Sequence, residues 1–134
     1  MTHEEKISWL SRYREAEKLY QRLSFRLAEA QEATRHITQN LSAAPGGSKD
    51  GQSLARAVER EEEAERRAYA QLAVLDALFA EIDAALVQLD ANEYCALRKY
   101  YLDGLKWEQV AADMNFTSRG IFALRRRAIE HLEL

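Results

Sequence analysis

Residues 94–132 read YCALRKYYLDGLKWEQVAADMNFTSRGIFALRRRAIEHL and contain two apolar segments with helical spacing on either side of a short break. A helix buries residues three or four positions apart on one face. The first segment predicts a short helix and the second a longer one. Their predicted inward residues are Trp107, Val110, Ala111 and Met114 in the first, and Ile121, Leu124, Ala128 and Leu132 in the second.

The break between the two segments has the residues that end one helix and begin another. Asn115 tolerates the left-handed backbone that follows a helix. Thr117 is a good N-cap, because its hydroxyl accepts from free N–H groups in the first turn. Upstream, Asp103-Gly104 is a turn signal that ends a further helix carrying Tyr94, Leu97 and Tyr101. This stretch therefore predicts a three-helix module with a helix-turn-helix arrangement.

The outer surface of the last predicted helix is basic. With Ile121 and its stripe turned inward, Arg119 and Arg126 face outward together with Phe122 and Ala123, and we expect Arg125 and Arg127 to flank that face. Arginine near the start of such a helix can reach phosphates and guanine edges. The alternative is an ordinary solvated helix face beside a small core.

A resemblance favours the first of these interpretations. The run LRKYYLDGLKWEQVA at 97–111, then FTSR at 116–119 and RRAIEHL at 126–132, resembles region 4 of bacterial primary sigma factors. The whole chain resembles a family of phage and prophage proteins related to the ArpU/RinA-type late-gene regulators. The resemblance implies double-stranded DNA as partner. The residues expected to contact it are Thr117, Ser118, Arg119, Phe122, Ala123, Arg125, Arg126 and Arg127.

One residue departs from the family pattern. Gly120 stands in the first turn of the expected reading helix, where the family usually has a long polar residue. Glycine costs a helix about 1 kcal/mol relative to alanine. It also removes one potential base contact.

The first 89 residues predict a long helical hairpin. A capping box at Thr2 and Glu5 opens a helix to about Asn40, and a second helix runs from about Ser53 to Leu89. Pro45 and three glycines make 42–52 a flexible loop between them. Both helices carry apolar seams with alternating steps of three and four, which indicate coiled-coil packing. The seams are Trp9, Tyr13, Ala16, Tyr20, Leu23, Leu27, Ala30, Thr34, Ile37 and Leu41, against Leu54, Val58, Glu61, Glu65, Ala68, Leu72, Leu75, Phe79, Ile82, Leu86 and Leu89.

Antiparallel pairing of these seams predicts which residues face each other. Leu23 is expected opposite Leu72, Phe79 beside Ala16, and Tyr13 opposite Ile82. Four apolar residues of the second helix lie off its seam and need other partners, which are Val74, Leu78, Ala85 and Val87. We expect some to pack on the C-terminal module and some on a second copy of the chain.

Composition and charge further restrict the classes of function that the chain can have. The 134 residues have a net charge of −3, but residues 93–134 carry seven Lys/Arg against six Asp/Glu, which fits a basic DNA-binding end on an acidic helical body. No apolar run is long enough to span a membrane and the N-terminus is not a signal sequence, so a cytoplasmic location is expected. The lone Cys95 is expected to be a buried structural thiol.

Nothing in the chain has the pattern of a catalytic or metal site. The acidic run at Glu61, Glu62, Glu63 and Glu65 is flanked by arginines and is typical of a solvated surface. His3, His36 and His131 are scattered, and Gly46–Lys49 lacks P-loop spacing. We expect no enzyme activity, no cofactor and no metal.

The sequence thus predicts an all-α protein with two parts. Residues 1–89 form a helical hairpin that mediates homodimerisation or higher oligomerisation, and residues 90–134 form a sigma-region-4-like helix-turn-helix module. The expected function is DNA binding and transcription regulation in a phage or prophage. Two alternatives are a DNA-packaging component of the small-terminase type and an adaptor that binds RNA polymerase with little DNA contact.

Overall fold

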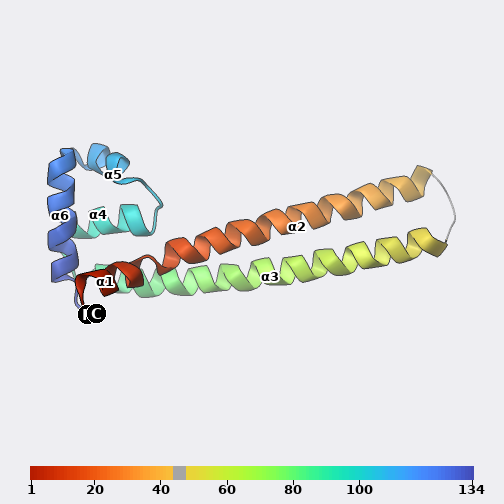
Figure 1. Cartoon of the computed structure of the whole chain (residues 1–134), viewed down its shortest axis with the longest axis horizontal. Helices are drawn as coiled ribbons and strands as arrows, with labels where there is room; N and C mark the ends of the chain where they lie inside the picture. Colours follow the sequence, from red (N-terminus) through yellow and green to blue (C-terminus); the bar gives the residue numbers. More distant parts are fainter. Residues whose placement is uncertain (44–47) are drawn as a thin grey trace. The chain divides into compact units, whose positions relative to one another are not determined.

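Helices account for all the regular structure of the part of the chain that the computed structural model describes, residues 1–43 and 48–134 (Figure 1). Over these residues there are six helices and no strand, so the predicted all-α class is confirmed. None of these helices is both long enough and apolar enough to cross a membrane. The helices are α1 (His3–Leu10), α2 (Arg12–Ala43), α3 (Ser48–Leu86), α4 (Ala91–Tyr101), α5 (Trp107–Met114) and α6 (Ser118–His131).

The chain divides into two compact units. The first combines Met1–Ala16 with Leu75–Leu134, and the second consists of Glu17–Val74. The predicted boundary near residue 90 coincides instead with the start of α4, where the Asp90 side chain accepts the N–H of Glu93 at 2.8 Å as the expected N-cap. The three C-terminal helices therefore share their compact unit with α1 and with the ends of α2 and α3.

The N-terminal helix begins as predicted but is interrupted. The capping box is present, with the Thr2 hydroxyl accepting from the N–H of Glu5 and the Glu5 carboxylate accepting from the N–H of Thr2, each at 3.2 Å. At Ser11 the helix breaks between α1 and α2. The Ser11 hydroxyl donates to the Ile7 carbonyl at 2.7 Å, a local bond that competes with helix geometry and bends helices.

The predicted loop over 42–52 is too long. Helix α2 extends to Ala43 and α3 begins at Ser48, so 48–52 are helical. Lysine, aspartate and glutamine in this part of the sequence are compatible with a helix, and Gly51 meets no neighbouring atom that a side chain would touch. Residues 44–47, including Pro45, lie outside the described residues.

In the second unit the predicted seam of α2 is confirmed. The seam of α3 differs, because at every second predicted position the more buried residue is the one that precedes it. Every predicted α2 seam residue of this unit is half-buried, and apart from Ser24 beside Leu23 the described residues next to them are exposed. On α3, however, Val58, Glu65 and Leu72 are exposed, and Ala57, Ala64 and Gln71 are the more buried residues in their place. Leu72, the predicted partner of Leu23, thus lies at the edge of the buried stripe. Small alanines on the buried side allow close approach of another helix, which favours this alternative stripe.

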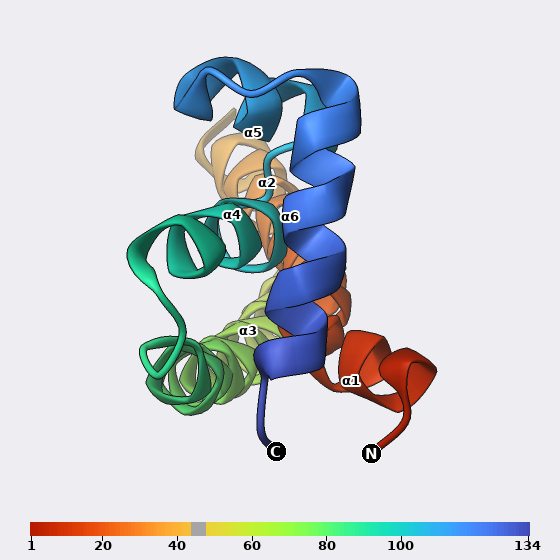
Figure 2. The ribbon, with the colours of Figure 1, turned by 90° about the vertical axis from the view of Figure 1, so that its left-hand side faces the viewer.

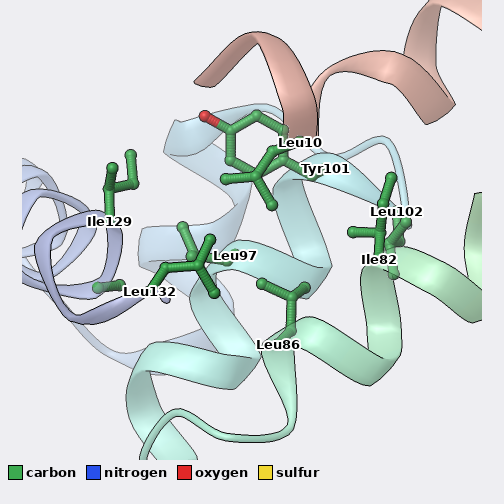
Figure 3. Close-up of a cluster of buried hydrophobic side chains, with 9 residues drawn as sticks. Leu10, Ile82, Leu86, Leu97, Tyr101, Leu102, Ile129 and Leu132 are labelled. Carbon is green, nitrogen blue, oxygen red and sulfur yellow. The ribbon is translucent and has the colours of Figure 1, made fainter. Parts of the chain in front are cut away.

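A cluster of large apolar side chains forms the core of the first unit. They come from α1, α3, α4 and the end of α6 and turn toward one another (Figure 3). The buried members are Leu10, Ile82, Leu86, Leu97, Tyr101, Leu102, Ala128, Ile129 and Leu132. Phe79 is half-buried at the edge of this cluster, where its ring meets that of Tyr13 edge-on at 5.8 Å.

The four off-seam residues of the α3 region have different surroundings. Ala85 packs on the core of the first unit, as expected for some of them, and Leu78 is half-buried. Val74 and Val87 remain exposed. Cys95 is only half-buried, so its thiol is less enclosed than predicted.

Polar contacts between helices stabilise the packing of the first unit. Within it, α6 runs past α4 and α5 and ends beside α1 (Figure 2). The Lys6 ammonium of α1 donates to the Ile129 carbonyl at 3.0 Å, near the end of α6. A cation there also interacts favourably with the helix dipole. Between α3 and α4, the Tyr94 hydroxyl donates to Asp83 at 2.7 Å, and that hydrogen bond raises the pKa of Tyr94.

Candidate nucleic-acid interface

The turn before α5 is built as the sequence predicts. Helix α4 ends at Tyr101, and Gly104 follows with a φ of 76°, a left-handed conformation that glycine adopts without steric cost. Helix α5 then begins at Trp107, where the Gln109 side chain accepts the N–H of Lys106 at 2.9 Å. This places the exposed Lys106 ammonium at the entrance of α5.

The link from α5 to α6 also matches the prediction residue by residue. Asn115 has a φ of 59°, the left-handed value expected of a helix-ending asparagine. The next N–H, of Phe116, donates back to the Ala111 carbonyl at 2.8 Å. Thr117 then caps α6, its hydroxyl accepting the N–H of Gly120 at 3.0 Å. Two helices are thus joined by a tight connection in which the N–H groups of Asn115, Phe116 and Gly120 are paired.

Gly120 has a packing role that the sequence did not reveal. A Cβ at this position would lie 3.1 Å from the Thr117 hydroxyl oxygen and 3.4 Å from the Phe116 ring. Any side chain there would therefore press on the cap and on the turn. Since the position is half-buried and faces the turn, glycine here does not remove a contact from the exposed face of α6.

The inward faces of α5 and α6 pack together as expected. Val110 and Ala111 from α5 are buried against Ile121 and Leu124 from α6, together with Ala96 of α4. The remaining predicted inward residues of α6, Ala128 and Leu132, belong to the core of the first unit. Burial of this stripe fixes which side of α6 faces outward.

The exposed face of α6 carries two unpaired arginines. Arg119 lies in the first turn, Arg126 lies seven residues or two turns later, and the small Ala123 lies between them. Neither arginine forms an ion pair with any described residue of the chain. The first turn contains no acidic residue, although Glu130 is exposed beyond Arg126. A basic surface of about two turns results.

Arg125, which the sequence predicts at the flank of this face, packs against Trp107 of α5 and does not extend freely into solvent. It is half-buried, and its guanidinium lies over the Trp107 ring, 5.4 Å from the ring centroid. The spacing explains its place, because Ile121, Arg125 and Ala128 are separated by four and three residues and share one stripe. Its Nε has no hydrogen-bond partner among the described residues, nor has the buried Tyr101 hydroxyl nearby. Burial raises the pKa of Tyr101, and the charge of Arg125 only partly offsets this.

The other predicted contact residues divide between the face and its flank. Arg127 is exposed one position after Arg126, at the flank of the face where the sequence predicts it. Thr117 and Ser118 are exposed at the start of α6, and Ser118 lines the groove beside Phe122. The residues that the structure brings together are therefore Thr117, Ser118, Arg119, Phe122, Ala123 and Arg126.

An open groove of about 450 Å³ lies beside Phe122, between α5 and the start of α6. Its floor is apolar and includes Trp107 and Ile121, and its rim includes Lys106 and Ser118. The spacing of the apolar residues predicts Trp107 only as an inward residue. In the structure its ring stacks on Tyr100 with centroids 4.3 Å apart and planes 12° apart, and it also contacts Phe122. The sequence feature that could have suggested this stacking is the pair of aromatic residues Tyr100 and Trp107, seven positions apart.

This arrangement has groups that can bind a polyanion, although the exposed Glu108 also lines the groove. Its cations are arginine and lysine, and its hydroxyls are exposed on the rim. No group of three or more His, Cys, Asp or Glu that could hold a metal occurs among residues 1–43 and 48–134. Comparisons with protein-family models, curated proteins and solved structures found no match to the chain.

Proposed function

We propose that the chain is a DNA-binding regulator of transcription in a phage or prophage, and that α5 and α6 form its helix-turn-helix. In this arrangement α6 is the reading helix and lies in the major groove of double-stranded DNA. Its N-terminal part lies deepest and its later turns lie beside the backbone. The phage setting and the role in transcription come from the sequence resemblance.

The observation that supports DNA binding best is the common face of Arg119 and Arg126. Both side chains are exposed, neither is used in an ion pair among the described residues, and the opposite side of the helix is fixed by burial of Ile121 and Leu124. Holding exposed arginines on a rigid helix reduces the entropy lost on binding. Arg119 is assigned to base edges and Arg126 to a phosphate.

The small excess of basic residues sets the expected affinity for DNA. With few unpaired cations on the face, one copy of the chain should bind DNA weakly and lose affinity steeply as salt is raised. Two copies acting together double the basic surface and would recognise two half-sites. Homodimerisation is therefore part of the proposal.

Selection from a pool of DNA duplexes with a randomised segment tests the proposal. Purified full-length protein should enrich one sequence or a small set, and gel shifts should show tighter binding to these than to scrambled duplexes of the same composition. A variant in which both Arg119 and Arg126 are alanine should show no enrichment while keeping its helical circular dichroism. Equal binding to all duplexes, or none to any, would exclude sequence-specific regulation.

A further inference from the structure

Phe122 is an exposed aromatic residue on the face of α6 that carries the unpaired arginines. Its side chain is 43% exposed, whereas the large apolar residues Ile121, Leu124 and Ile129 of the same helix are buried. Packing within the chain therefore does not require an aromatic residue here. An apolar side chain that is exposed among cations indicates a surface that a binding partner covers.

The phenyl ring is held in place by its neighbours. It lies against the Trp107 ring with centroids 6.3 Å apart and planes inclined at 51°. Trp107 is itself fixed by stacking on Tyr100 and by the guanidinium of Arg125. With Trp107 on one side of the ring, the exposed part of Phe122 faces outward from α6.

The chemistry of the ring restricts what it can recognise in the major groove. A phenyl group neither donates nor accepts a conventional hydrogen bond. The base edges in that groove offer donors and acceptors at every base pair, and one apolar group, the 5-methyl of thymine. Contacts from phenylalanine and alanine to this methyl are an established type of base recognition. Ala123, next to Phe122 and also exposed, suits the same apolar surroundings.

We propose that Phe122 reads the 5-methyl group of a thymine next to the base pair contacted by Arg119. The inference deepens the proposed function and rests on it. Arg119 and Phe122 are three residues apart, which is about 4.5 Å along a helix axis, close to the roughly 3.4 Å between successive bases of a strand. The two side chains thus fit adjacent base pairs. The open groove beside the ring leaves room for the methyl group.

Replacing single thymines by deoxyuridine tests the inference directly. The substitution removes only the methyl group and leaves base pairing intact. In the duplex selected by the wild-type protein, one thymine in each half-site should show about a three- to fivefold loss of affinity on replacement, the size expected for burying one methyl group. Every other thymine should be neutral.

Protein variants assign that loss to a residue. Phe122→Ala should bind the thymine duplex about as weakly as wild type binds the deoxyuridine duplex, and it should no longer distinguish the two. Phe122→Leu should keep part of the difference. Phe25→Ala, which alters an aromatic side chain 67% exposed in the second unit, should behave as wild type. Circular dichroism of each variant checks that the helices are retained.

The outcomes separate this inference from the proposed function. Absence of binding to any duplex removes the proposed function and the inference together. Specific binding with no penalty at any deoxyuridine overturns only the reading of thymine. A penalty that persists in Phe122→Ala shows that another residue contacts the methyl group, which also overturns the assignment.

Discussion

The carboxylate of Glu93, at the start of α4, lies 2.7 Å from Nδ1 of His131, the last residue of α6. Only 4% of Glu93 is exposed, and the two residues are 38 positions apart in sequence. A buried carboxylate is stable only with hydrogen-bond partners. This contact therefore couples the two helices between which the core of the C-terminal part is packed.

Removing the imidazole should destabilise the fold although His131 is itself exposed. His131→Ala leaves the Glu93 carboxylate without this partner in a buried position, at a cost of about 1–3 kcal/mol. Urea unfolding followed by circular dichroism measures the difference. His36→Ala, which removes an exposed histidine of α2, is the matched control and should change stability by less than about 0.5 kcal/mol. Equal, small effects of both variants would show that the contact contributes nothing.

Asp90 should make stability depend on pH in the acid range. Its carboxylate accepts the N–H of Glu93, and this hydrogen bond holds the pKa of Asp90 below its usual value. A lowered folded-state pKa stabilises the fold fully above the unfolded-state pKa, and the contribution is lost as pH falls through the folded value.

Asp90→Asn provides the comparison, because asparagine also caps helices but does not titrate. The wild-type protein should be the more stable at pH 7, and the difference should shrink as pH is lowered below about 4. Urea unfolding at a series of pH values measures it. A difference that stays constant over this range would mean that the Asp90 carboxylate is not linked to folding.

The sequence predicted the region around the candidate interface more accurately than the helical body. Around α5 and α6 strong local signals agree, since Asn115, Gly104 and Thr117 each have the backbone role that their chemistry favours. The basic face could be predicted only in part. Helical spacing gives the position of Arg125 on α6. Residue type alone suggested that its side chain would be exposed to solvent, but a long arginine side chain can instead lie over a ring such as Trp107.

The helical body was harder to predict because two seams compete on α3. Val58 and Leu72 are the larger apolar residues and therefore determined the predicted seam, yet Ala57 and Ala64 are the more buried. Which stripe is buried depends on how closely the facing helix approaches, and that is a tertiary property. The break at Ser11 was missed for a similar reason, since serine is tolerated within helices and bends them only through its particular hydrogen bond.

Phe79 should contribute to the core of the first unit through its ring contacts. It is half-buried, meets Tyr13 edge-on, and has the Arg98 guanidinium 5.5 Å from its ring centroid. Phe79→Ala should lower the free energy of unfolding by about 2–4 kcal/mol, somewhat less than full burial would give. Thermal and urea unfolding measure it against Phe25→Ala, whose effect should stay within about 0.5 kcal/mol. Similar losses in both would show that the contacts of Phe79 are not specific.

Self-association is expected from apolar side chains left exposed on α3. Tyr69, Leu72 and Val74 lie within the second unit and are 64%, 37% and 45% exposed. Light scattering at micromolar concentration should give a mass above the 15.4 kDa of one copy. Replacing Tyr69 and Leu72 together by serine should shift the protein toward monomer, whereas Leu134→Ser, at the exposed C-terminus, should not. A wild-type monomer at all concentrations contradicts this expectation.

The two arginines of the α6 face should differ in how they affect DNA binding. Arg119, in the first turn, is assigned to a base edge, so Arg119→Ala should weaken binding to the selected duplex by about 1–3 kcal/mol and hardly affect random DNA. Arg126, two turns later, is assigned to a phosphate. Arg126→Ala should weaken both about equally and reduce the log–log salt slope by about one.

Gel-shift titrations on both duplexes at several salt concentrations separate these effects. Arg66→Ala is a suitable control, because Arg66 is exposed on α3 and already paired with Glu63, so its removal should leave affinity and salt slope unchanged. If Arg119→Ala weakens selected and random DNA alike, it contacts a phosphate and another residue must read the bases. If neither variant of α6 changes binding, its exposed face does not contact DNA, and protein docking through this surface, as in an adaptor for RNA polymerase, becomes the better explanation.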